Sequence, residues 1–167
     1  MNMIRCAMFL AATLCCSAFA NAEGVVRTLD IEWLKDGQTV ASTTSVLQGH
    51  NDRLSPFLTQ SGGQVGYVVC TRQGNGQSLV SKEKFVGRLL SIMPVSEADS
   101  GISVDVTAID NKLVGMRDVT DGSCESKLAD TTGLDVSGIR VTLRDGEPVD
   151  VPLGDPHYQL RLSLSSR

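Results

Sequence analysis

The sequence GISVDVTA at residues 101–108 alternates apolar and polar side chains. Its apolar members share one parity: Ile102, Val104, Val106 and Ala108. The residues between them are polar and have the opposite parity. A period of two is typical of a β-strand with one buried face and one face in water. This stretch therefore predicts a half-buried strand and favours an all-β fold.

Similar alternation continues outward from this strand in both directions. Toward the amino terminus it recurs at residues 25–33, 38–47 and 65–70, and Asp36-Gly37 between the first two is typical of a hairpin turn. Toward the carboxyl terminus it recurs at residues 139–143, 149–153 and 158–164. Short strands joined by Gly- and Asp-rich turns predict an antiparallel sandwich or open barrel of about 7–9 strands.

Three segments lack this clear pattern. Residues 48–63 form a polar connection that contains His50 and is compatible with a short strand near Phe57. Residues 120–138 are polar and acidic around Cys124, so we expect a tethered loop there. Residues 81–90 are compatible with a strand or with one or two helical turns. The sequence leaves that choice open.

The last alternating segment is the most regular one near the carboxyl terminus. Leu160, Leu162 and Leu164 alternate with Arg161 and small polar residues, so one face should bury three leucines. We expect this segment to complete the fold or to offer an edge to a partner strand.

Residues 1–22 resemble a secretory signal. Arg5 precedes a mostly apolar stretch at residues 6–20, and Ala20-Asn21-Ala22 has the small-x-small order of a cleavage site. The apolar stretch is shorter than the roughly 20 residues that span a bilayer, which disfavours an uncleaved anchor. We expect cleavage after Ala22, or after Ala20, and a periplasmic or secreted single β domain at residues 23–167 with no transmembrane span.

Removal of the signal leaves two cysteines, Cys70 and Cys124. In an oxidising compartment such a pair favours one disulfide, and two free thiols are the alternative. Closing a loop of this length would stabilise the fold by about 4 kcal/mol on the loop-entropy estimate. Neither His50 nor His157 lies at a zinc-ligand spacing from a cysteine, so no metal site is expected.

Charge and motifs exclude several function classes. The chain carries 15 basic and 19 acidic residues, a net charge of -4, with no basic run, so nucleic acid is not an expected partner. The Gly-x-Ser-x-Gly motif of many hydrolases is absent, and His157 near Asp155 reads as turn chemistry. We expect no catalytic residue and no cofactor. The leading hypothesis is a non-enzymatic envelope protein that binds another protein or supports an assembly.

Two families share local features with the chain. FVGRLLSIMP at residues 85–94 and GISVDV at 101–106 resemble a hairpin of the outer-membrane domain of secretins, and DGEPV at 145–149 is similar to the turn and strand that follow there. The resemblance implies a small envelope protein of a Gram-negative bacterium. The chain is shorter than secretins and lacks their repeated amino-terminal domains, so pore formation is not expected.

The second resemblance suggests an alternative function. YVVC at residues 67–70, before a glycine-rich turn, is similar to periplasmic lysozyme inhibitors, although their Ser-Gly-x-x-Tyr loop is absent. This similarity implies an inhibitor of an envelope enzyme. A hydrolase that uses His157 is a further alternative.

Overall fold

The computed structural model describes residues 26–47, 55–74, 76–98 and 100–167. In these ranges the chain forms eight β-strands, which pair antiparallel in two sheets. The strands are β1 (Arg27–Lys35), β2 (Gln38–Val46), β3 (Phe57–Gln73), β4 (Gly76–Ala98), β5 (Gly101–Asp121), β6 (Cys124–Leu143), β7 (Pro148–Val151) and β8 (Tyr158–Ser166). The predicted signal at residues 1–22 and His50 lie outside the described residues.

The first sheet has the strand order β2-β1-β8-β7. β1 and β8 pair along their whole length, from Arg27 opposite Ser166 to Lys35 opposite Tyr158. The turn from β1 to β2 is formed by Asp36 and Gly37, both at positive φ. This is the backbone geometry that favours Asp-Gly in two-residue hairpins.

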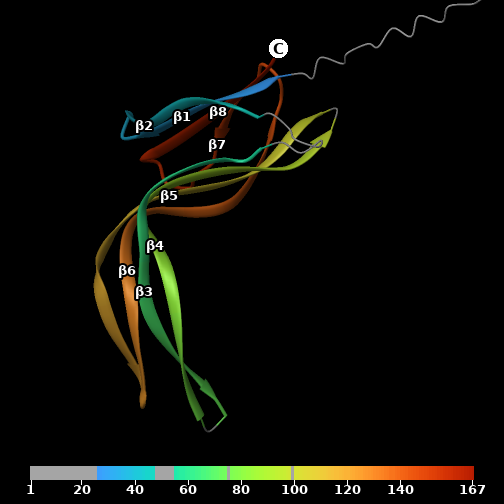
Figure 1. Ribbon diagram of the computed structural model, residues 1–167. Helices are drawn as coiled ribbons and strands as arrows, with labels where there is room; N and C mark the ends of the chain where they lie inside the picture. The colour runs from blue at the N-terminus through green and yellow to red at the C-terminus, as the bar shows by residue number, and fades with distance from the viewer. Residues whose placement is uncertain (1–25, 48–54, 75, 99) are drawn as a thin grey trace, which may run out of the picture.

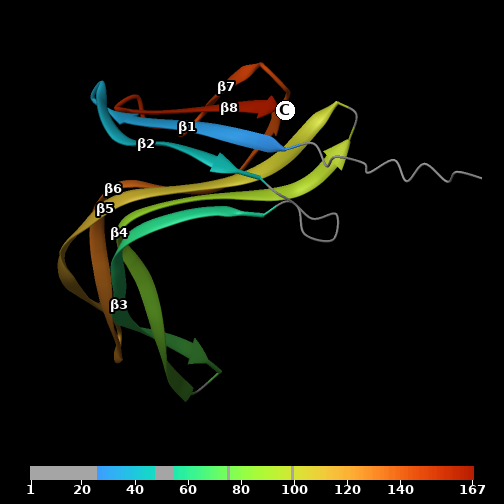
Figure 2. The ribbon, with the colours of Figure 1, turned by 45° about the horizontal axis from the view of Figure 1, so that its top comes forward.

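The second sheet contains the four longest strands in the order β3-β4-β5-β6. Each is joined to the next as a hairpin, and β3 also meets β6 where Val68 lies opposite Lys127. The first sheet lies over one half of these strands (Figures 1 and 2). The other half extends away from it.

The hydrophobic core lies between the two sheets. The first sheet contributes every second residue of β1 and β8 to it, among them Trp33 and Leu162, both fully buried. Eight buried residues come from β4, β5 and β6 of the second sheet: Leu90, Ile92, Ile102, Val104, Val106, Ala108, Leu134 and Leu143. The stretch 101–108 is therefore half-buried as its alternation predicts.

The strands of the second sheet change direction along their length (Figure 2). A row of four paired residues crosses this sheet. Gly62 of β3 lies opposite Gly87 of β4, Gly87 opposite Asn111 of β5, and Asn111 opposite Gly133 of β6. We call these four residues the bend row. All eight core residues of this sheet lie on the side of the bend row that faces the first sheet.

The bend row leaves no space for larger side chains at its glycines. A Cβ at Gly62 would lie 2.3 Å from the Val86 carbonyl oxygen, and one at Gly87 would lie 2.3 Å from that of Ser61. Both glycines have positive φ, 147° and 134°, where other residues are strained. Asn111, 3% exposed, accepts a hydrogen bond from the Gly87 amide.

We call the half of the second sheet beyond the bend row the arm. It comprises residues 63–73, 76–86, 112–121 and 124–132. Of the arm residues whose burial the structure describes, Cys124 alone is buried. The arm therefore has almost no hydrophobic core of its own.

One sequence prediction is corrected, because residues 120–138 are not a loop and most of them belong to β6. The strand expected near Phe57 is present as the start of β3, which is much longer than a short strand. Residues 81–90 lie within β4 and are strand, which settles the choice that the sequence left open. The all-β class, the antiparallel pairing and the strand number are confirmed.

A polar network joins the first sheet to the second beside the bend row. Asp110 accepts hydrogen bonds from the Tyr158 hydroxyl at 2.9 Å and from the Lys35 ammonium at 3.1 Å. Its other oxygen accepts one from Arg88 at 3.3 Å. Burial would raise the pKa of Asp110, but hydrogen bonds from Tyr158 and Lys35 and the charge of Arg88 lower it overall.

Replacing Gly62 by alanine should destabilise the fold by about 2 kcal/mol or more, because the methyl group would collide with backbone across the ladder at a strained φ. Gly66→Ala on the same strand is the matched control, since a Cβ there meets nothing within 4 Å. Urea unfolding of both variants measures the difference. Equal midpoints would contradict the role of the bend row.

Asp110→Asn should lower the free energy of unfolding at pH 7 by about 1–3 kcal/mol, because it removes the charge that three donors share. The folded-state pKa of Asp110 is lowered, so its contribution is present above the unfolded pKa of about 3.9 and is lost as pH falls through the folded value. The difference in the free energy of unfolding between the wild type and the variant should narrow below about pH 4. A gap that stays constant under acid would refute this assignment.

Candidate binding groove on the arm

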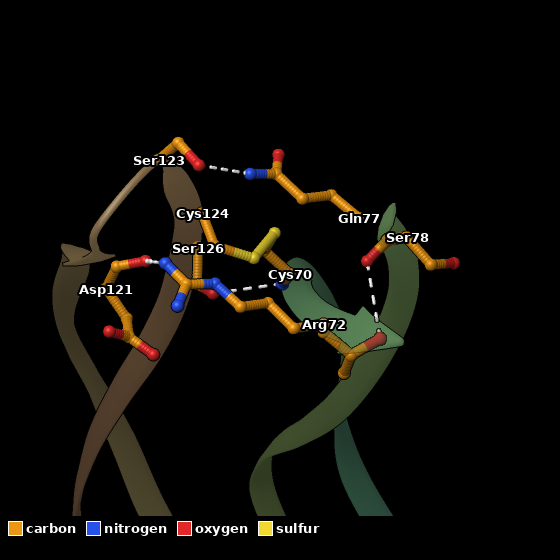
Figure 3. Close-up of a disulfide and its surroundings, with 9 residues drawn as sticks. Cys70, Arg72, Gln77, Ser78, Asp121, Ser123, Cys124 and Ser126 are labelled. Carbon is orange, nitrogen blue, oxygen red and sulfur yellow. Dashed lines mark hydrogen bonds between the residues drawn. A yellow bond between two sulfur atoms is a disulfide. The ribbon is translucent and has the colours of Figure 1, made fainter. Parts of the chain in front are cut away.

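A disulfide between Cys70 and Cys124 joins the two hairpins at the tip of the arm (Figure 3). The cysteines are 54 residues apart in sequence and their Cα atoms are 5.6 Å apart. Cys70 lies near the end of β3, and Cys124 is the first residue of β6. The predicted pairing is confirmed, although it joins two strands and not a strand to a loop.

Hydrogen bonds add to the disulfide at the same tip (Figure 3). The Cys70 amide donates to the Ser126 hydroxyl at 2.9 Å, and Arg72 donates to the Asp121 carbonyl at 2.6 Å. Gln77 donates to Ser123 in the turn between β5 and β6. These contacts connect the β3–β4 hairpin to the β5–β6 hairpin by side chains and by one covalent bond.

A groove of about 650 Å³ lies between the two hairpins near this tip. Strands β3, β4 and β5 contribute two residues each to its lining: Val68, Cys70, Gln77, Leu79, Asp118 and Thr120. The rest of the lining comes from the β5–β6 turn and the start of β6: Ser123, Glu125, Ser126 and Lys127. The groove is therefore bordered by all four strands of the arm.

Large apolar side chains are exposed on β4 and β5 of the arm. Leu79 is 68% exposed and Val114 is 69% exposed, and three more exceed one third: Val80, Leu113 and Met116. These five are spread along the two strands, and sequence neighbours such as Leu79 and Val80 point to opposite faces.

Charge is unevenly distributed around the groove. Its lining holds two carboxylates, Asp118 and Glu125, and one ammonium group, Lys127. Elsewhere on the arm, Arg117 donates two hydrogen bonds to Asp130, at 2.8 and 3.2 Å, and these lower the pKa of Asp130. The groove lining therefore carries a formal charge of minus one and favours neutral or basic ligand groups.

The structure places the predicted leucines of the last strand in the core. Leu160, Leu162 and Leu164 are at most 3% exposed, and β8 lies between β1 and β7. β8 therefore completes the fold by pairing on both sides, and the three leucines are not available to a partner strand. The outer strands of this sheet are β2 and β7. The leucines were expected to complete the fold or to offer a partner edge, and their strand is an interior strand of the sheet.

His157 lies in the turn before β8 and contacts the β1–β2 turn. Its Nδ1 is 2.7 Å from an Asp36 carboxylate oxygen, and its amide donates to Asp155 at 2.9 Å. The hydrogen bond and the charge of Asp36 raise the pKa of His157. Both side chains are well exposed, at 68% and 61%. The pair therefore links two turns at the surface.

Comparisons of the chain with protein families, with curated proteins and with solved structures find no match. In the described ranges no group of three or more His, Cys, Asp or Glu side chains is placed to hold a metal ion. Over the same residues, no helix is long and apolar enough to cross a membrane. The case for a site therefore depends on the arm itself.

The sequence missed this groove for a physical reason. The strands of the arm bury little of either face. Because no face of these strands must be apolar, residues 76–83 and 120–132 show no alternation of apolar and polar residues. One signal was available. The predicted disulfide between Cys70 and Cys124, the two cysteines outside the signal, implies that the segments around them meet, and both segments border the groove.

The titration midpoint of His157 should lie above the ordinary value of about 6.5, because the Asp36 carboxylate stabilises the imidazolium form. Asp36→Asn should move the midpoint back toward that value, and Asn tolerates the positive φ at this position. Two-dimensional NMR of the ring protons across pH 5–9 measures both. A midpoint that does not respond to Asp36→Asn would show that the pair does not form in solution.

Proposed function

We propose that the chain is an exported, non-enzymatic protein of the cell envelope whose arm binds another protein. One observation carries the proposal. The arm projects from the part of the molecule that contains the core. Its strands expose large apolar side chains that the core does not use. In this proposal the two sheets form a sandwich that anchors the molecule, and the arm is used for recognition.

The export part of the proposal has separate support. Arg5, the apolar stretch at residues 6–20 and Ala20-Asn21-Ala22 have the order of a secretory signal. The Cys70–Cys124 disulfide is compatible with an oxidising compartment. Amino-terminal sequencing of the protein from fractionated cells should give Glu23 as the first residue of a periplasmic product.

Inhibition of an envelope enzyme is a second candidate. The segment YVVC at residues 67–70, which is similar to periplasmic lysozyme inhibitors, contributes Val68 and Cys70 to the groove. The same surface would then bind an enzyme. Addition of the purified mature protein to a lysozyme assay on bacterial cell walls tests this candidate directly.

Photo-crosslinking in cells tests the binding function. A benzophenone amino acid replaces Leu79, which lines the groove, or Leu58, which is 59% exposed on β3 outside the arm. Position 79 should give a discrete crosslinked band that contains a second protein. Position 58 is the matched control because it is a similarly exposed leucine. No discrete product at position 79, or the same products at both, would overturn the proposal.

A further inference from the structure

Two strands of the arm have one side without a β-sheet partner. β4 pairs with β5 from Gly87 opposite Asn111 to Ala98 opposite Gly101. Beyond the bend row, residues 76–86 pair only with β3, and residues 112–121 pair only with β6, among the described residues. The backbone amides and carbonyls on the free sides are therefore available to another strand.

Side chains of both strands line the groove. Gln77 and Leu79 of β4 line it together with Asp118 and Thr120 of β5. β3 and β6 lie between β4 and β5 in the arm, so the two free sides are on opposite margins of the groove (Figure 1). An added strand at one margin would therefore meet unpaired backbone on β4 or on β5.

Features that block edge pairing are concentrated close to the bend row. β5 has a bulge at Val114, where its register with β6 shifts, and Lys112 lies beside it. On β4, Lys82 and Lys84 occupy the equivalent part of the edge. Bulges and lysines are the devices that protect sheet edges from unwanted pairing. Toward the tip, residues 76–81 of β4 carry no bulge, no proline and no charged residue, whereas residues 115–121 of β5 include Arg117, Asp118 and Asp121, so the β4 edge is the more open one there.

We propose that the partner of the arm lays an extended segment of its own chain along the β4 margin of this groove and adds a strand to β4. This inference rests on the proposed binding function and names the form of the partner. Strand addition takes affinity from backbone hydrogen bonds and specificity from alternate side chains. The groove is lined by the apolar side chains of Leu79 and Val68 and by the disulfide. It also holds two acidic side chains, Asp118 and Glu125, and one basic side chain, Lys127. The inserted segment therefore alternates apolar residues with polar ones and carries a lysine or arginine.

The disulfide fixes the inner strands that form the floor of this site. It joins β3 to β6, so that the two hairpins cannot separate at the tip while β4 and β5 remain unpaired there. A site that is held open in advance binds a strand with a smaller loss of conformational entropy.

Selection from a displayed library of ten-residue peptides, randomised at every position, tests the inference on the mature disulfide-bonded protein. Enriched peptides should alternate apolar and polar residues and contain Lys or Arg. Leu79→Lys should weaken their binding about ten-fold or more, and the matched control Leu58→Lys should leave it within about two-fold, because only Leu79 lines the groove. Methylating alternate backbone nitrogens of an enriched peptide should cause a similar loss, since these amides pair with the edge.

The outcomes separate this inference from the proposed function. No enrichment over a parallel selection on the Leu79→Lys variant, acidic enriched peptides, or full binding by the N-methylated peptide would overturn the inserted strand as described. Crosslinking from position 79 to another protein would in that case leave the binding function standing. Crosslinks that join two copies of this chain would identify a different occupant and would also overturn the inference.

Discussion

The absence of side-chain space at the bend row is the constraint on which the rest of the structure depends. Four strands approach one another so closely there that a Cβ at Gly62, Gly87 or Gly133 would lie 2.3 Å from a carbonyl oxygen. Asn111 is the one member with a side chain, and it bonds to backbone of β4 through the Gly87 amide and the Phe85 carbonyl. The bend separates the half of the sheet that is covered from the half that is bare.

This division assigns stability and recognition to different parts of the same four strands. On one side, alternating residues pack against the first sheet, and Asp110 ties Lys35 and Tyr158 to the sheet at the bend. On the other side, one disulfide and a few hydrogen bonds hold the hairpins together. The arm can therefore expose apolar side chains and unpaired strand edges, because the core does not need them.

The same division explains how much the sequence could predict. Alternation at residues 101–108 and at Leu160 to Leu164 reflects burial of one face, so the strands of the covered half were readable. Residues 120–132 have no such pattern, and they were expected to be loop although they form β5 and β6. The predicted Cys70–Cys124 bridge located the tip of the arm, but nothing in the sequence indicated that β4 and β5 part at Gly87 and Asn111.

Residue-resolved hydrogen exchange of the mature protein tests the central claim, that β4 is covered on both sides above the bend row and open on one side below it. Residues 88–92 pair with β3 and β5, so all their amides should be protected. Residues 76–86 pair with β3 alone, so every second amide should exchange fast. Uniform protection along residues 76–86 would mean that the edge is already paired, and it would contradict this account of the arm.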